Sequence, residues 1–180
     1  TVEQVAGRLG GGAGLGGVTS TFLKQILLRH GAASRQLRTT MASLAEWMAN
    51  SYPPWAAYRA LRMGRLIALD KCPGIRPVGI GEIWSRLIAK IVLVEAGPEA
   101  KYACGDSQLC AGLEAGIEGG IHAVNQFWKE IELEENNGFL LIDARNAFNE
   151  LSRAAMLWTV RHEWPSGARF VFNCYKRWAI

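Results

Sequence analysis

The sequence lacks the features that mark membrane, secreted and zinc-binding proteins. No apolar run is long enough to cross a bilayer, and the N-terminus lacks the charged, apolar and small-residue order of a signal peptide. We therefore expect an intracellular protein with no membrane partner. The cysteines form no CxxC pair and have no histidine at ligand spacing, which favours reduced, mostly buried thiols over a zinc site or a disulfide framework (Cys72, Cys104, Cys110 and Cys174).

A glycine-rich stretch over residues 7–17 lacks the context of a nucleotide-binding loop. Gly12, Gly14 and Gly17 match the spacing G-x-G-x-x-G, but no alternating β-branched strand precedes them, as a dinucleotide-binding turn requires. A P-loop needs Lys and then Ser or Thr after its last glycine, whereas Val18 and Thr19 follow here. We therefore predict that residues 1–18 are a flexible, glycine-rich lead-in.

The charge of the chain is unevenly distributed. Its 180 residues are 49% apolar and 20% charged, which is typical of a globular protein. Residues 1–90 carry 12 Lys and Arg against 4 Asp and Glu, whereas residues 91–180 carry 8 against 12. A basic half suits a polyanionic partner, and an ordinary solvated surface is the alternative. The chain starts at Thr1 and stops in an apolar stretch, so we expect a piece of a longer protein.

Apolar residues at helical spacing predict that most of the chain is helical. Thr19 or Ser20 can cap the first helix, which ends near Gly31, and Pro53 and Pro54 stop the second. The remaining helices follow the same periodicity. The predicted helices after the first cover residues 35–50, 83–96, 117–132, 152–164 and 168–178.

A basic hairpin interrupts these helices. Residues 66–69 and 78–80 have the composition of strands, and Pro73-Gly74 at the centre of the intervening segment predicts a tight reversal. The hairpin places Lys71 and Arg76 at or beside its tip. Two cations there can bind a phosphate chain, and two solvated surface charges are the simpler interpretation.

An apolar run, residues 139–142, leads into Asp143 and then into an amphipathic pattern typical of a helix. The run predicts a buried strand that brings one carboxylate to the edge of a sheet. A carboxylate in that position is suited to a divalent metal beside a phosphate. Because strands ending in Asp are common in α/β folds, this feature identifies a metal site only together with others.

Three blocks of the chain, in the correct order, resemble the N-terminal half of a reverse transcriptase of non-LTR, LINE-like retrotransposons. Residues 13–18, with Phe22 and Leu23, resemble the PGPDGI block of that family. Residues 70–80 and 84–90 resemble its fingers hairpin and RPI segment. Residues 141–149 resemble its first palm motif, in which an aromatic residue follows an Asp by five positions.

This resemblance implies an incomplete α+β domain. It would contain a helical N-terminal part, a basic β-hairpin belonging to the fingers, and the start of a polymerase palm. The implied divisions are a fingers-like region at 19–132 and the start of the palm at 133–180, with a strand that ends at Asp143 and is followed by helices. The implied activity is that of an RNA-directed DNA polymerase, with an RNA template, a DNA primer and dNTPs as partners.

The resemblance also implies roles for individual positions. Asp143 would be a ligand of two catalytic Mg2+ ions, with the backbone carbonyl of Ala144 as a second contact. These ions would stabilise the entering and leaving oxygens during attack of the primer 3′-hydroxyl. Phe148 would lie beneath the sugar of the incoming nucleotide and exclude a 2′-hydroxyl, although an aromatic residue there can also simply pack the next helix.

The implied binding residues are all basic. Lys71 and Arg76 would hold the triphosphate and offset the charge that develops on the pyrophosphate leaving group. Arg86 or Lys90 would contact the template or primer backbone. Cys72 stands where the family often has another basic residue, which predicts weaker binding of the triphosphate at the hairpin tip.

Two departures from the family limit the expected activity. Ala13 and Gly16 replace the usual Pro and Asp of the first block, and the later palm motifs that complete the metal site are absent from the 180 residues. One carboxylate does not hold two Mg2+ ions, because Mg2+ requires an octahedral shell of several oxygen ligands. We therefore expect that the isolated chain does not polymerise.

Two other functions remain as alternatives. The chain could be a non-catalytic nucleic-acid-binding remnant of a mobile element, in which the basic residues between 58 and 90 bind a backbone and Asp143 is structural. It could also be a phosphate-handling enzyme with Asp143 as nucleophile. The second alternative is disfavoured because Arg145 occupies the place of the usual second acid. The widely separated His30, His122 and His162 do not suggest a catalytic group.

Overall fold

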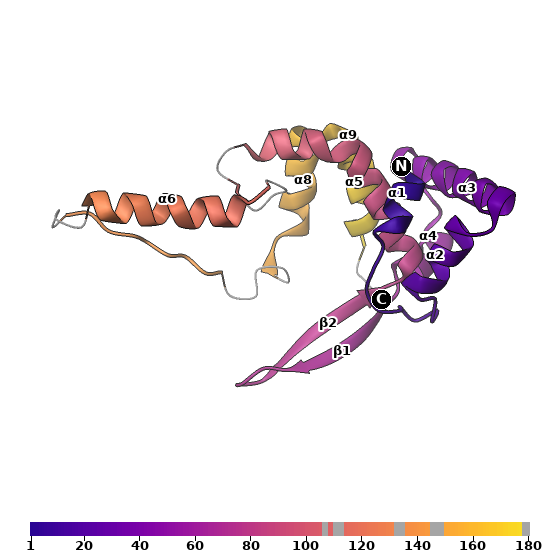
Figure 1. The fold of residues 1–180 in the computed structure, drawn as a ribbon, viewed down its shortest axis with the longest axis horizontal. Helices are drawn as coiled ribbons and strands as arrows, with labels where there is room; N and C mark the ends of the chain where they lie inside the picture. The colour runs from indigo at the N-terminus through magenta and orange to yellow at the C-terminus, as the bar shows by residue number, and fades with distance from the viewer. Residues whose placement is uncertain (106–107, 110–113, 132–135, 145–149, 178–180) are drawn as a thin grey trace.

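The computed structural model describes residues 1–105, 108–109, 114–131, 136–144 and 150–177. The fold is mixed helix and strand, as expected for an α+β protein (Figure 1). The described elements follow in the order α1 (Val2–Gly7), α2 (Ser20–Leu28), α3 (Gly31–Asn50), α4 (Trp55–Arg62), β1 (Gly64–Asp70), β2 (Ile75–Gly81), α5 (Ile83–Cys104), α6 (Gly116–Ile131), α8 (Arg153–Glu163) and α9 (Pro165–Tyr175).

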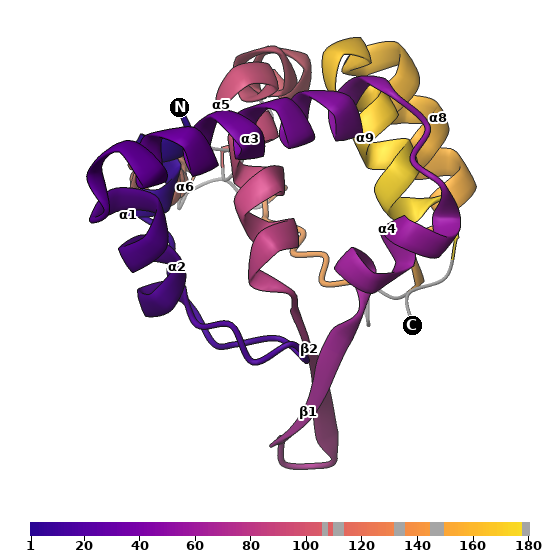
Figure 2. The same ribbon diagram turned by 90° about the vertical axis from the view of Figure 1, so that its right-hand side faces the viewer.

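The core of the molecule is built around α5. This helix contacts α1, α3, α4 and α9, and its buried face meets apolar side chains from each of them (Figure 2). Its residues Leu87 and Ile88 have no exposed surface. Burial of such side chains stabilises the fold by about 1.5–3 kcal/mol each. The other large members of the core include Leu23, Leu27, Met41, Met48, Tyr58 and Phe170.

Local capping explains where the first predicted helix begins. The Thr19 side chain accepts a hydrogen bond from the Phe22 N–H at 3.2 Å, so α2 begins at Ser20 as predicted. The Ser34 hydroxyl donates to the Ile26 carbonyl at 2.7 Å and connects α3 to α2. The helices predicted at 35–50, 83–96, 117–132, 152–164 and 168–178 are found as α3, α5, α6, α8 and α9. Their ends differ from the prediction, most of all in α5, which continues past the predicted end at 96 to Cys104.

A buried asparagine joins α9 to the end of α3. The Asn173 side chain is fully buried, and its Nδ2 donates to the carbonyls of Met48 at 3.1 Å and Ser51 at 2.8 Å. These carbonyls lie at the C-terminal end of α3, where no further helical turn supplies donors. A second connection runs from Trp164 Nε1 to the Ala96 carbonyl of α5 at 2.7 Å.

The predictions for the N-terminal segment and for the cysteines need correction. The flexible lead-in predicted for residues 1–18 contains α1, whose Val2, Val5 and Ala6 are part of the core. A six-residue helix has little stability of its own and forms here by packing, which sequence periodicity over so short a span does not reveal. The thiols of Cys72 and Cys104 are exposed, although we expected mostly buried cysteines, and both are free.

The buried strand predicted at residues 139–142 does not form. Residues 137–144 have no regular structure, and Leu140, Leu141 and Ile142 are 84–91% exposed. Within the described part of the chain, the only strands are β1 and β2, which pair with each other. An apolar run becomes a strand only where another strand satisfies its backbone groups, and the described residues supply no such neighbour to 139–142.

The segment 137–144 instead lies beside α6, apart from the helical body (Figure 1). The Phe139 ring contacts Phe127 edge-on, with 5.5 Å between centroids, and stacks on Trp128 at 5.6 Å. Further along the apolar face of α6, Ile117, Ile121 and Val124 are exposed, whereas Ile131 at the end of the helix is buried. No helix in the described ranges combines the length and apolarity that crossing a bilayer would require.

Candidate functional site

The structure contains the hairpin that the sequence predicted. β1 and β2 pair antiparallel from Gly64↔Gly81 to Asp70↔Ile75. At the tip, the Lys71 N–H donates to the Gly74 carbonyl at 2.9 Å, and Gly74 has φ +98°, which glycine adopts without strain. Pro77 is tolerated in β2 because each strand of a two-stranded ribbon has one open edge.

The register places the basic residues of the hairpin on one face. Side chains alternate between the two faces of a strand, and residues paired across the ribbon share a face. Arg65 therefore shares a face with Leu69, and Arg76 joins them because it pairs with Leu69. Lys71 follows at the tip, and all three cations are exposed.

The hairpin cations have no ion-pair partner among the described residues. No carboxylate in these ranges lies within ion-pair distance of Arg65, Lys71 or Arg76. Asp70 belongs to the opposite face of the ribbon from Arg76. The exposed basic face can therefore take up an anionic partner without first breaking an internal pair. Arg65 was not among the residues predicted for this role, although counting by twos from the turn would have found it.

Arg86 has a role different from the predicted contact with a nucleic-acid backbone. Its Nη1 donates to the Gly10 carbonyl at 3.0 Å and its Nη2 donates to the Gly12 carbonyl. Its Nε is buried without a hydrogen-bond partner. Gly11, between the two carbonyls, has φ +94°. The guanidinium thus binds the glycine-rich loop of residues 8–18 inside the chain.

Glu82, one helical turn before Arg86, holds the other end of this loop. The side chain is 7% exposed, and its Oε1 accepts a hydrogen bond from the Gly16 N–H at 2.6 Å. Glu82 and Arg86 together fix the loop beside the base of the hairpin, where Gly12 approaches Ile80. Lys90, the next residue along this series, is exposed on α5.

The predicted metal ligands do not form a metal site among the described residues. Asp143 and Ala144 are exposed and lie in the irregular segment 137–144, and Phe148 lies outside the described residues. Within the described ranges, no three His, Cys, Asp or Glu side chains are grouped closely enough to hold an ion. Because Mg2+ binds through several oxygen ligands, Asp143 alone does not fit this metal.

Asp143 is also not joined to the hairpin. Across the described ranges, no hydrogen bond or ion pair connects it with Lys71 or Arg76. The structure therefore brings together the glycine-rich loop, Glu82, Arg86 and the base of the hairpin, but it leaves the predicted catalytic carboxylate separate from them.

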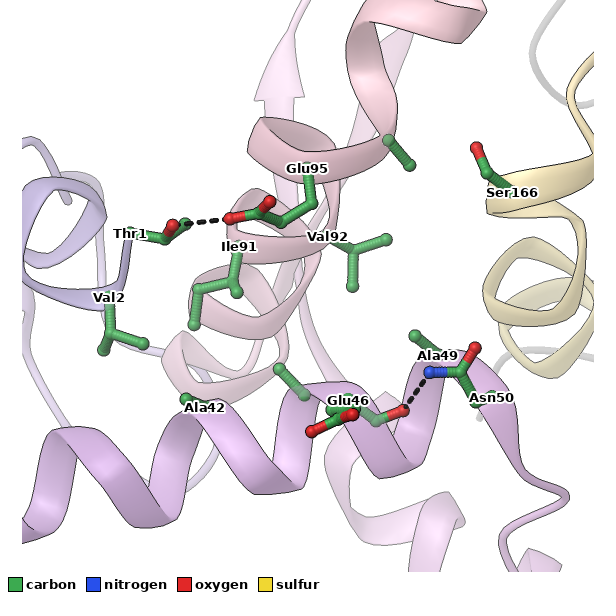
Figure 3. A pocket seen from close by; sticks show the side chains of 12 residues that line it. Thr1, Val2, Ala42, Glu46, Ala49, Asn50, Ile91, Val92, Glu95 and Ser166 are labelled. Atoms are coloured by element: carbon green, nitrogen blue, oxygen red, sulfur yellow. Dashed lines mark hydrogen bonds between the residues drawn. The ribbon is translucent and has the colours of Figure 1, made fainter.

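A cavity of about 540 Å³ lies away from all of these residues, among α1, α3, α5 and the start of α9 (Figure 3). Its walls are mostly alanine, valine and isoleucine, and the polar groups around it include the carboxylates of Glu46 and Glu95. The Thr1 hydroxyl donates to Glu95 Oε1 at 2.5 Å. Two carboxylates disfavour a phosphate ligand, so this cavity is unsuited to a nucleotide.

Comparison with known proteins identifies no relative. No family model matches the chain, and no curated protein and no solved structure gives a significant match.

Proposed function

We propose that the hairpin of residues 64–81 binds phosphate groups of nucleic acid or of a nucleotide, as part of an RNA-directed DNA polymerase. In this proposal the chain supplies the fingers and the first segment of the palm. The observation that carries the proposal is the exposed basic face of the ribbon, with Arg65 and Arg76 on one side and Lys71 at the tip. Phosphate contacts of this kind supply most of the non-specific affinity for nucleic acid.

The anchored loop supports the same proposal. Because Glu82 and Arg86 hold residues 10–16 beside the base of the hairpin, the ribbon leaves the helical body from a fixed platform. A fixed platform lowers the entropy that is lost when the ribbon binds a partner. Under the polymerase proposal, Asp143 would contribute one of several Mg2+ ligands, and the rest are not among the described residues.

A non-catalytic nucleic-acid-binding protein is the second candidate. It is favoured by the exposed, irregular surroundings of Asp143, which differ from the buried strand end that a catalytic carboxylate would occupy. Both candidates predict binding through the hairpin. They differ in whether Asp143 contributes to the binding of a nucleotide with its metal.

The test of hairpin binding is fluorescence anisotropy with a labelled RNA–DNA primer–template over a series of salt concentrations. The double variant Arg65→Gln/Arg76→Gln should bind more weakly, and the slope of log affinity against log salt should fall by about 1.8, at about 0.9 for each phosphate that the variant no longer neutralises. The matched control is Arg29→Gln/Arg35→Gln, which removes the same charge from exposed positions on the helical body. Equal slopes for the two double variants would refute the proposal.

A second measurement separates the two candidates. Binding of a fluorescent dNTP should depend on added Mg2+ and should weaken in Asp143→Asn if Asp143 belongs to a polymerase site. Nucleotide binding that is indifferent to both Mg2+ and Asp143→Asn, with primer–template binding retained, would favour the non-catalytic candidate.

A further inference from the structure

Aromatic and basic side chains from distant parts of the chain meet on α9, on a surface separate from the hairpin. The Arg169 guanidinium lies over the Tyr52 ring, 3.8 Å from its centroid. Lys176 Nζ lies 5.2 Å from the same centroid and 5.5 Å from that of Phe172. Tyr52 and Phe172 are in edge-on contact, with centroids 5.9 Å apart. No alternating aromatic and basic pattern is visible in the sequence, because Tyr52 follows α3 while its partners belong to the C-terminal end of the described chain.

A cleft of about 360 Å³ opens beside this group, between α9 and α8. Its described lining includes two arginines and two aromatic rings, and no carboxylate is among these residues. We call it the α8–α9 cleft. Its main lining residues are Tyr52, Leu157, Arg161, Pro165, Arg169 and Phe172.

The side chains that line the α8–α9 cleft are suited to an anionic ligand that contains a planar ring. Guanidinium groups bind phosphate oxygens in a two-pronged geometry, and an aromatic side chain offers a stacking surface to any base. Tyr52 is 62% exposed and Phe172 36%, so both rings are accessible from solvent. A cleft of this volume is at the small end of ligand sites and suits a single nucleotide unit.

We propose that the α8–α9 cleft binds one nucleotide unit of a single-stranded nucleic acid. Arg161 and Arg169 bind the phosphates, and the base stacks on Tyr52 or Phe172. A single strand is required because the bases of a duplex are stacked on one another and present only their edges. Arg62, which lies 5.7 Å from the centroid of the Tyr175 ring, and Lys176 add further positive charge near the C-terminal end of α9.

This site is independent of the hairpin. Both views of the molecule place α8 and α9 away from the hairpin tip (Figures 1 and 2). The α8–α9 cleft also differs in chemistry, because the hairpin face combines cations with aliphatic side chains and has no aromatic ring. The cleft can therefore bind nucleic acid even if the hairpin does not, and the hairpin can bind it even if the cleft does not.

The test uses the 180-residue chain and a labelled oligothymidylate of about 20 nucleotides, followed by fluorescence anisotropy. Tyr52→Leu should weaken binding about tenfold, since stacking on one aromatic side chain is worth about one decade in affinity. Arg161→Gln/Arg169→Gln should lower the salt slope by about 1.4, at about 0.7 for each single-strand phosphate that is no longer neutralised. Arg29→Gln/Arg35→Gln is the control of equal charge, and far-UV circular dichroism checks that each variant is folded.

An abasic oligonucleotide of the same length separates a nucleotide site from a general basic surface. It should bind at least tenfold more weakly than oligothymidylate, and Tyr52→Leu should not weaken it further. Photocrosslinking of a 4-thiouridine-containing strand should label peptides that contain Tyr52 or Phe172. Three results would overturn the proposal. The first is equal affinity for abasic and base-containing strands. The second is that Arg161→Gln/Arg169→Gln and the control variant bind oligothymidylate with the same affinity and salt slope, and the third is crosslinks confined to residues 64–81.

Discussion

The carboxylate of Glu82 accepts a hydrogen bond from the backbone N–H of Gly16 at 2.6 Å, across 66 residues of sequence. Glu82 follows β2 directly and precedes α5, so this bond ties the glycine-rich loop to the junction between the hairpin and the central helix. Arg86 completes the attachment through the carbonyls of Gly10 and Gly12. Two charged side chains, that of the α5 N-cap Glu82 and that of Arg86 within α5, thereby hold the glycine-rich loop in one conformation.

The first prediction concerns the close approach of Gly14 to Glu82. A Cβ added to Gly14 would lie 2.8 Å from Glu82 Oε1 and 2.9 Å from its Cα, which is too close for either atom. Gly14→Ala should therefore lower the free energy of unfolding by about 1–3 kcal/mol, measured by urea denaturation. Gly10→Ala is the matched control, because a Cβ there meets nothing within 4 Å. Equal stability of the two variants would show that Glu82 does not confine the loop.

The second prediction concerns Cys174, a partly buried residue that packs against the core and whose thiol lies 3.2 Å from the hydroxyl of the core residue Tyr58. Burial raises the pKa of the Cys174 thiol, and burial together with the neighbouring Cys174 raises the pKa of Tyr58. The thiolate is the reactive form of cysteine, so Cys174 should be alkylated by iodoacetamide at pH 8 at least tenfold more slowly than the exposed Cys72 and Cys104. Peptide mass spectrometry measures each rate, and equal rates would contradict the burial of Cys174.

The same raised pKa fixes the direction of a pH effect on stability. Because the folded chain favours the neutral thiol, Cys174 contributes stability that is fully present below the unfolded-state pKa of about 8.5 and is lost as the pH rises through the folded-state pKa. The free energy of unfolding should therefore fall as the pH rises above this unfolded-state pKa. Cys174→Ala should reduce this fall, whereas the exposed Cys72→Ala should leave it unchanged.

The hairpin was predictable because its determinants are local. Pro73-Gly74 sets the reversal, and the flanking residues set the strands, so the register follows from the turn. The role of Arg86 was not predictable in this way, because the carbonyls that it binds come from a loop more than 70 residues earlier. The sequence does not distinguish a basic residue that binds nucleic acid from one that binds carbonyl groups of the protein's own backbone.

The same distinction explains the other errors. α1 is helical because Val2, Val5 and Ala6 pack against the core, and the aromatic and basic group around Tyr52 forms only because α9 meets the end of α3. The strand predicted at 139–142 fails for the opposite reason. Its apolar composition is a local signal, but a partner strand is a non-local requirement that composition cannot supply.

The fourth prediction tests the failure of the strand at 139–142. Leu141 is 91% exposed and Leu87 is fully buried. Leu141→Ala should therefore change the free energy of unfolding by less than about 0.5 kcal/mol, whereas Leu87→Ala should lower it by about 2–5 kcal/mol. Urea denaturation of the two variants measures the difference. A cost for Leu141→Ala close to that of Leu87→Ala would contradict the exposure of Leu141 and would mean that this residue is buried in solution.

The last prediction concerns catalysis by the chain alone. Asp143 is exposed. In the described ranges, it does not belong to any group of three His, Cys, Asp or Glu side chains that could hold an ion. Nucleotidyl transfer by a two-metal site needs several oxygen ligands that share the ions. Residues 1–180 should therefore extend a primer on an RNA template no faster than their Asp143→Asn variant, in a gel assay with Mg2+ and labelled dNTPs. Incorporation that depends on Asp143 would contradict this expectation, because it would require the remaining ligands to lie within these 180 residues.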